Sequence, residues 1–374
     1  MNENKEIEFD NQEELESLNE NITKPFSTKD IKVTNAIVLL PSVINRLNYE
    51  EIDLSPDFQR NSDLWNKTRM SRLVESILLK LPLPIFYFDV SNPDKWLIVD
   101  GLQRLSTIKR FFVDKNLRLT NLEFLKDLEG KNYEELDRTF KRTIDDTELI
   151  TYQIEAQTPK EVRYSIFHRI NTGGMSLNAQ EIRQALNQKG FSVEFLKEVC
   201  SDKKFKDIVG ISSKRMLDRE LALRFVAFRL TSYKEFNTNN MGGFLDKAME
   251  KLDLIEDKRA LEVLKNDLLE TLIFSEKILG KNHRFSRAIA NDKVTKTLNR
   301  SLFDVITVCF SEIDDKEQFI KNKDIFLSKL KGLLLEDKGI FPKSITEGTS
   351  GKTAVENRFN IMDELVNEVL NEKN

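Results

Sequence analysis

The sequence predicts an α+β domain followed by an all-α domain, which we place at residues 25–187 and 188–374. Short runs rich in β-branched and aromatic residues, typical of strands, occur only in the first half of the chain. Apolar residues at three- and four-residue spacing, typical of helices that face a core, occur in both halves and dominate the second. The length of 374 residues also agrees with about two domains.

Composition and charge limit the class of protein. Apolar residues make up 40% and charged residues 32% of the chain, which excludes collagen-like, low-complexity and fully disordered proteins. The net charge is −4, but residues 1–24 carry eight acids and two lysines, so the rest of the chain is near neutral. Residues 25–374 therefore lack the strongly positive electrostatic potential of a dedicated nucleic-acid-binding protein. Residues 1–24 also have few large apolar side chains, and we expect them to form a disordered acidic tail.

The cysteines, the histidines and the amino terminus limit which sites and which cellular location we expect. Cys200 and Cys309 are far apart, so neither a disulfide framework nor a cysteine-based zinc site is expected. His168 and His283 are the only histidines and have no metal-ligand spacing around them, which argues against a histidine-dependent nuclease site. The amino terminus is acidic and no window is apolar enough to span a membrane, so we expect a cytoplasmic protein without a membrane anchor.

The predicted elements of the first domain alternate between strands and helices. The predicted strands are residues 36–40, 85–90, 96–99 and 148–154, and the predicted helices are 67–81, 102–112 and 159–170. In the second domain, the spacing of Leu217, Leu221, Phe225 and Phe228 predicts a core-facing helix. Loops are expected at residues 237–243 and 345–352.

The segment from Trp96 to Arg104 is the most informative for function. An apolar strand leads to Asp100 and Gly101, after which a helix is expected to begin. The N–H groups of its first turn would form a cradle for an anion or phosphate. Gly101 would let a ligand approach closely, Gln103 and Arg104 would donate to phosphate oxygens, and Asp100 would hold a metal ion or orient water. The alternative is a tight turn whose helix is capped by Asp100.

A second candidate segment is residues 54–61, which includes Gln59 and Arg60. Its polar donors suit a base, a phosphate or a partner carboxylate. The alternative is a surface turn in which Arg60 pairs with an acid and Phe58 packs into the core.

A third candidate is residues 167–183, where one helix is expected to stop at a double glycine and another to start. A capping box of Asn178 and Glu181 would explain most of this segment. The capping box does not explain a cluster of polar donors beside Gly173, namely Arg169, Asn171 and Thr172. These side chains would close over a bound phosphate.

The charged residues of the second domain have simpler explanations. Glu220 and Arg224 are spaced for an ion pair on one helix. The basic runs 203–206 and 214–215 are interrupted by acids and an aromatic residue, which favours a solvated helix surface over contact with a phosphate backbone.

The three motifs together resemble a known family. PDFQR at 56–60, VDGLQRLSTI at 99–108 and FHRINTGGMSLNAQEIR at 167–183 occur in the order and spacing of the ParB/sulfiredoxin-like proteins typified by the amino-terminal half of the GmrSD type IV restriction enzymes. The resemblance covers about residues 30–190. It implies a ParB/sulfiredoxin-like nucleotide-binding domain that hydrolyses nucleoside triphosphates (NTPs) with Mg²⁺ and serves in defence against invading, often modified, DNA.

The resemblance also implies roles for individual residues. The family's DGQQR motif falls on residues 100–104, with Leu102 in place of the middle glutamine, which removes one polar contact. Catalytic roles are implied for Asp100, Gln103 and Arg104, with Mg²⁺ at Asp100. Nucleotide-binding roles are implied for Gln59, Arg60, Gly101, Arg169, Asn171, Thr172 and Gly173.

The chain departs from the GmrSD enzymes because it lacks the residues for their HNH-like nuclease half. We therefore predict a nucleotide-binding, NTP-hydrolysing component of a prokaryotic DNA-defence system that gates action on DNA or on a separate nuclease subunit. In that prediction Asp100, Arg104, Arg60 and Arg169 meet at one cleft. One alternative is a non-hydrolysing nucleotide sensor or DNA-binding adaptor, and another is a helical scaffold whose ParB-like part is vestigial. If the protein takes part in DNA cleavage without a partner, the ParB-like domain itself must cut.

Overall fold

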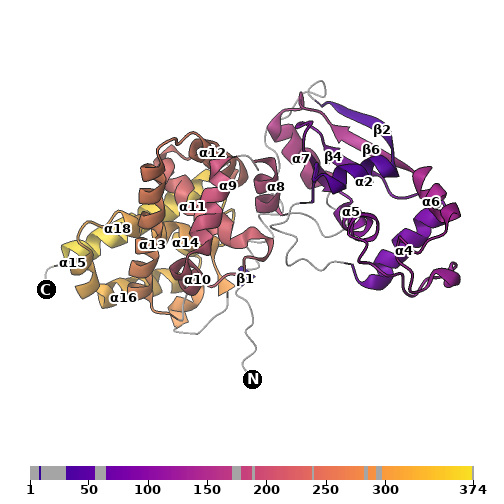
Figure 1. The fold of residues 1–374 in the computed structure, drawn as a ribbon. Helices are drawn as coiled ribbons and strands as arrows, with labels where there is room; N and C mark the ends of the chain where they lie inside the picture. Colours follow the sequence, from indigo (N-terminus) through magenta and orange to yellow (C-terminus); the bar gives the residue numbers. More distant parts are fainter. Residues whose placement is uncertain are drawn as a thin grey trace. The chain divides into compact units, whose positions relative to one another are not determined.

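The protein is described by a computed structural model that covers residues 8–9, 31–54, 65–170, 178–187, 190–237, 240–281, 285–291 and 297–372. The chain divides into two compact units, Lys24–Leu186 and a second unit made of Met1–Thr23 with Asn187–Asn374. Figure 1 shows a sheet with helices in the first unit and a bundle of helices in the second. The predicted α+β fold class is confirmed.

The first unit is built on a five-stranded mixed sheet in the order β2-β6-β4-β5-β3. Its strands are β2 (Val33–Leu39), β3 (Ile52–Asp53), β4 (Phe86–Asp89), β5 (Trp96–Asp100) and β6 (Glu148–Ile154). Its α-helices are α2 (Leu40–Asn48), α4 (Lys67–Leu78), α5 (Leu102–Ile108), α6 (Arg138–Asp145), α7 (Lys160–Ile170) and α8 (Ala179–Leu186). A π-helical turn, η2 (Lys109–Val113), continues α5, and η3 (Lys126–Leu128) is a short 3₁₀ turn.

The two faces of this sheet are covered by different helices. On one face Phe86, Phe88 and Ile98 pack in a large apolar core with residues of α2, α4 and α5. On the other face Leu97 and Val99 pack with residues of α7 and α8. Strand β5 is therefore buried on both sides, which explains its uninterrupted apolar sequence.

The predicted strands of the first unit are confirmed, with shifted ends. Strand β2 begins at Val33 and ends at Leu39, because Pro41 lies in the first turn of α2. Strand β3 was not predicted, since its two residues are too few to show a period. Helices α2 and α6 were also missed.

The predicted helices are confirmed with one difference in type. Helix α4 ends at Leu78, shortly before Pro82 and Pro84. The helix expected over 102–112 is α-helical only to Ile108 and then widens into the π-helical turn. The predicted capping box is present at α8, where the Glu181 N–H donates to Asn178 Oδ1 at 2.9 Å and the Asn178 N–H donates to Glu181 Oε2 at 2.7 Å.

The second unit is helical, as predicted, apart from one short strand pair. Its α-helices are α9 (Phe191–Ser201), α10 (Lys203–Val209), α11 (Leu217–Leu230), α12 (Met241–Asp253), α13 (Lys258–Leu279), α14 (Arg300–Ser311), α15 (Lys316–Lys321), α16 (Lys323–Leu335), α17 (Ile340–Ser344) and α18 (Lys352–Asn371). The 3₁₀ turns are η5 (Lys214–Met216), η6 (Tyr233–Glu235) and η7 (Arg287–Asn291). Part of the loop expected at 237–243 is helical, because Asn240 caps α12 by accepting from the Gly243 N–H at 3.1 Å.

The strand pair involves two residues of the expected tail. Strand β1 (Glu8–Phe9) pairs in parallel with β7 (Thr297–Leu298). These two residues are thus ordered against the helical unit, and the disorder of the other residues up to 24 stays a prediction.

A buried charge network joins three helices of the second unit. The predicted pair of Glu220 and Arg224 on α11 is confirmed, with 3.6 Å between Oε1 and Nη1. Arg224 also binds both carboxylate oxygens of Asp304 on α14, at 2.9 and 2.7 Å. Arg300 approaches Glu220 at 3.0 Å and Arg358 on α18 approaches Asp304 at 3.7 Å. All five groups are shielded from solvent, so these charges belong to the core and not to a solvated surface.

A buried carboxylate fixes the long loop of the first unit. Glu75 on α4 is 3% exposed and accepts from the backbone N–H groups of Glu123, Phe124 and Leu125 at 2.7–2.9 Å. Burial alone would raise the pKa of Glu75, but these hydrogen bonds and Arg72 outweigh it and the pKa is lowered. The charged form of Glu75 therefore stabilises the fold.

We predict that Glu75→Gln lowers the free energy of unfolding by about 1–3 kcal/mol at pH 7, because the new amide presents an N–H group to backbone donors. A group with a lowered folded-state pKa stabilises above its ordinary pKa of 4.5 and loses this effect as the pH falls below it. The difference between variant and wild type, measured by denaturant unfolding, should therefore shrink at acid pH. Glu123→Gln, which changes an exposed ion pair, is the control and should have little effect. An equal loss at pH 7 and at acid pH would contradict the assignment.

Candidate functional site

The predicted strand, turn and helix are present at the most informative motif. Asp100 is the last residue of β5, Gly101 is the N-cap and α5 begins at Leu102. The Asp100 side chain accepts from Arg104 and is not the N-cap of the helix. The capping expected in the alternative interpretation is therefore wrong, whereas its strand, tight turn and helix are present.

Gly101 occupies a position that other residues fill only with strain. Its φ is +106°, in the region where a side chain clashes with its own backbone. A Cβ at this position would lie 2.6 Å from the ring of Phe86 and 3.2 Å from Nη2 of Arg104. The turn can thus close tightly against β4 only because residue 101 is glycine.

Arg104 is a buried clamp between three segments. Its side chain is 9% exposed. Its Nη1 donates to the Pro84 carbonyl, and its Nη2 donates to the Ile85 carbonyl at 3.1 Å and to Asp100 Oδ2 at 2.9 Å. The guanidinium also lies 4.3 Å from the ring centre of Phe86. Burial lowers the pKa of Arg104, and Asp100 opposes this shift in part.

Asp100 is oriented by this clamp but faces solvent. Its side chain is 44% exposed, and Oδ2 receives the Arg104 hydrogen bond. Mg²⁺ is commonly held by one or two carboxylates together with phosphate oxygens and water. One exposed, oriented carboxylate at a glycine turn fits such a site, in which the ligand would supply most of the oxygens.

Gln103 links the motif to the start of α4. Its Oε1 accepts from the Trp65 N–H at 3.2 Å, two residues before α4 begins. Gln103 therefore holds Trp65, just before α4, beside the motif. Its assigned catalytic role stays a prediction.

The other predicted site residues are only partly described. Gln59, Arg60, Asn171, Thr172 and Gly173 lie outside the described residues. Arg169 lies in the last turn of α7 and is exposed. The meeting of Arg60 and Arg169 with Asp100 in one cleft stays a prediction.

Two tyrosines beside the motif were missed by sequence reasoning. Tyr87 of β4 is the register partner of Asp100, and its ring stacks on Tyr152 of β6 with 5.3 Å between centroids. Both side chains are half-buried on the sheet face that α7 and α8 cover in part. Alternation along each strand predicts which face of the sheet Tyr87 and Tyr152 lie on. That the two rings are neighbours depends on the order of the strands in the sheet, which the sequence does not show.

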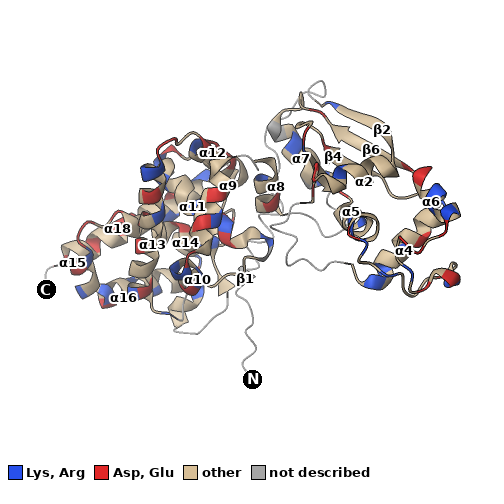
Figure 2. Cartoon of the chain, in the orientation of Figure 1, with Lys and Arg blue, Asp and Glu red and all other residues tan. Residues whose placement is uncertain are grey.

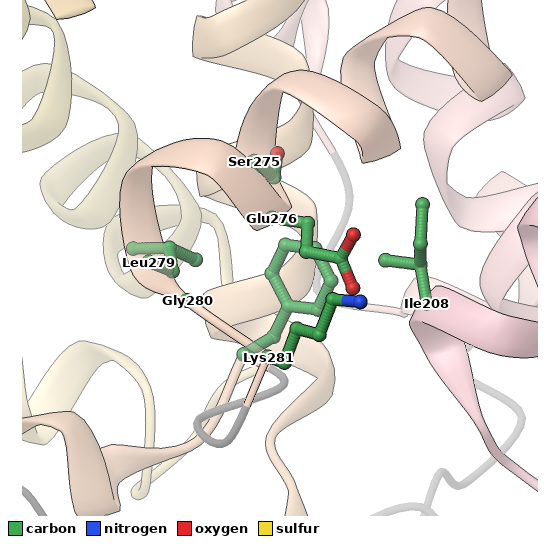
Figure 3. A pocket seen from close by; sticks show the side chains of 7 residues that line it. Ile208, Ser275, Glu276, Leu279, Gly280 and Lys281 are labelled. Carbon is green, nitrogen blue, oxygen red and sulfur yellow. The ribbon is translucent and has the colours of Figure 1, made fainter.

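The second unit offers no comparable site within its described residues. A hollow beside the end of α13, lined by Ile208, Glu276, Lys281 and Phe285 among others, has a volume of only about 10 Å³ (Figure 3). That volume holds about one water molecule. The described residues contain no cluster of three or more His, Cys, Asp or Glu side chains suited to a metal. No helix among them has the length and apolar character to cross a membrane.

Comparison with known proteins agrees with the motifs. Residues 42–188 match the family model of the GmrSD restriction endonuclease N-terminal domain. This segment is therefore similar to the GmrSD N-terminal domain, and the predicted resemblance is confirmed for it. The family indicates a role in a restriction-like DNA-defence system. No curated protein and no solved structure matches the chain.

We predict that Gly101→Ala destabilises the first unit by about 2–4 kcal/mol, combining backbone strain with overpacking against Phe86. Gly130→Ala is the matched control, because Gly130 has a φ of +77° but no atom within 4 Å of the added Cβ. Thermal unfolding of both variants separates the two causes. Equal losses would show that contact with Phe86 adds nothing.

We also predict that Arg104→Lys destabilises the first unit by about 1–3 kcal/mol, since an ammonium cannot reproduce the planar fork that reaches two carbonyls and a carboxylate. Arg118→Lys, at an exposed ion pair, should change stability by less than about 1 kcal/mol. Denaturant unfolding measures both. A fully stable Arg104→Lys protein would contradict the clamp.

Proposed function

We propose that this protein is the nucleotide-binding component of a restriction-like DNA-defence system and binds a nucleoside triphosphate with Mg²⁺ at Asp100. The observation that carries the proposal is the exposed Asp100 carboxylate, which Arg104 orients at a glycine turn. The family match of residues 42–188 supports the DNA-defence role.

In the proposed site, an acidic residue binds the metal ion, and basic and polar residues bind the phosphates. Asp100 would bind Mg²⁺, which neutralises charge on the phosphates and lowers the pKa of a bound water molecule. Gly101 permits the tight turn that presents Asp100, since a Cβ there would meet the Phe86 ring. Residues Arg60, Arg169, Asn171 and Thr172 would supply the phosphate donors.

The contacts of Arg104 change the role that we propose for it. The sequence motif predicts that its guanidinium neutralises phosphate charge. In the structure it donates to two backbone carbonyls and Asp100, so releasing it to phosphate would break three hydrogen bonds in the interior. We therefore propose Arg104 as a positioning residue that sets the direction of Asp100.

The same observation favours a second candidate function. A site whose nearest arginine serves the fold has less positive charge with which to stabilise a transition state for phosphoryl transfer. Leu102 also stands where the family motif has a polar residue. Both features favour a sensor that binds a nucleotide without hydrolysing it, and whose occupancy shifts the protein between two states.

We propose that a separate nuclease subunit supplies any cleavage of DNA, because an HNH-like site depends on histidine and the sequence has only His168 and His283. The alternative is that the ParB-like domain itself cuts. Nucleotide occupancy would then control when the nuclease partner or DNA is engaged.

We predict that Asp100→Asn weakens Mg²⁺-dependent nucleotide binding by about tenfold or more, equivalent to about 1.4 kcal/mol, and abolishes any phosphate release. Asn keeps an oxygen for Arg104 but loses the negative charge that attracts the metal. Asp94→Asn, at an exposed turn of the same unit, is the control and should bind as the wild type does. Calorimetry with each of the four NTPs and a phosphate-release assay, with and without DNA, measure the effect.

The outcomes separate the two candidates. Phosphate release that disappears in Asp100→Asn supports the hydrolase. Nucleotide binding without release supports the sensor. Absence of nucleotide binding in the folded wild-type protein would contradict both.

A further inference from the structure

The open edge of the first unit's sheet is strand β2. It lies at one end of the strand order, and within the described parts of the chain only β6 pairs with it. With seven residues β2 is as long as β6, and no other strand of the sheet is longer. Such an edge presents a row of backbone donors and acceptors to any strand that approaches it.

The backbone groups that face this edge can be identified. The Leu40 N–H donates to the Thr147 carbonyl, and the Glu155 N–H donates to the Lys32 carbonyl. Hydrogen-bonded pairs alternate along an antiparallel ladder, so the even-numbered residues of β2 bond to β6. The N–H and C=O groups of the odd-numbered residues therefore point to the open edge. These residues are Val33, Asn35, Ile37 and Leu39.

Exposed apolar side chains lie along the same edge. Ile37 is 66% exposed and Leu39 is 49% exposed. Ile150 of β6, directly opposite Ile37 in the register, is 46% exposed. Together the three form an apolar surface beside backbone groups that no described strand pairs with, which is a feature of interaction sites.

Strand β2 lacks the features that usually prevent edge pairing. Between Val33 and Leu39 there is no charged residue and no proline, and Figure 2 shows the strand without red or blue. Its register with β6 is continuous over all seven residues, without a bulge. Charges, prolines and bulges are the common protections of exposed edges.

We propose that two copies of this chain pair through β2, antiparallel and about a two-fold axis, to form a homodimer with a continuous sheet. In the register centred on Ala36, Asn35 lies opposite Ile37 of the second copy, and Val33 lies opposite its Leu39. All the outward-facing N–H and C=O groups of both strands are then paired. This inference does not depend on the nucleotide site.

The strand is compatible with a second copy of itself. A two-fold interface places one surface against the same surface, so its residues must be compatible with themselves. An uncharged strand brings no like charges into opposition when it pairs with itself. Ala36 falls at the axis in a closely spaced pair, where the strands approach most nearly and a small side chain fits.

The test is the association state of the full chain in solution, measured by sedimentation velocity over a range of concentrations. The wild type should form a reversible dimer. Ile37→Lys should weaken self-association at least about tenfold, because it places an ammonium group on the apolar surface beside the axis. Circular dichroism should show an unchanged fold. Val263→Lys, at a 68% exposed position of α13 in the other unit, is the matched control and should dimerise as the wild type does.

A second variant tests the register. In the double variant Asn35→Asp with Ile37→Lys, the new carboxylate of each chain lies opposite the new ammonium group of the other. Two ion pairs across the axis should restore much of the dimer that Ile37→Lys alone loses, and added salt should weaken this restored dimer.

Three results would overturn the proposal. The first is a wild type that stays monomeric at every concentration. The second is a dimer that Ile37→Lys leaves as strong as Val263→Lys does. The third is a monomer whose Asn35 and Ile37 amides are protected from hydrogen exchange, which would show that another segment of the same chain occupies the edge.

Discussion

The architecture of the first unit depends on the hydrogen bonds that the buried guanidinium of Arg104 donates. One side chain on α5 reaches the two carbonyls that lead into β4 and the carboxylate that ends β5. Because an arginine buried without these partners would be costly, the partners fix the angle between helix and sheet. The glycine before the helix and the Phe86 ring beneath it are consequences of the same close approach. The exposed direction of Asp100 then follows, since Arg104 holds one of its oxygens.

Much of the fold could be predicted because its elements follow simple periods. The β-branched and aromatic content of Glu148–Ile154 and the apolar stripe of α4 each give the type and position of the element. The features that were not predicted were either too short to show a periodic pattern, such as Ile52–Asp53, or determined by tertiary contacts. The change from α-helix to π-helix after Ile108 and the helical Gly242 and Gly243 belong to the second kind.

The site was predicted in part for a similar reason. A strand that ends in Asp-Gly before a helix is a local pattern, so the turn at Asp100 could be placed from the sequence alone. The partners of a side chain are not local. Nothing in the spacing of Arg104 shows that it points to Pro84 and Ile85 and not to solvent, and nothing in β4 shows that Tyr87 lies beside Asp100. The motif therefore placed the turn, whereas the contacts of Arg104 depend on the tertiary structure.

The charge network of the helical unit has a consequence for how this protein can evolve. Glu220, Arg224, Arg300, Asp304 and Arg358 come from three helices that are far apart in sequence, and each member shields the charge of another. Loss of one member leaves a buried charge without its counterpart, whereas replacement of a whole pair by apolar residues of similar volume is often tolerated. In related helical units these positions should therefore change together. The substitutions at these positions would then be correlated among related sequences, whereas independent substitutions would not be.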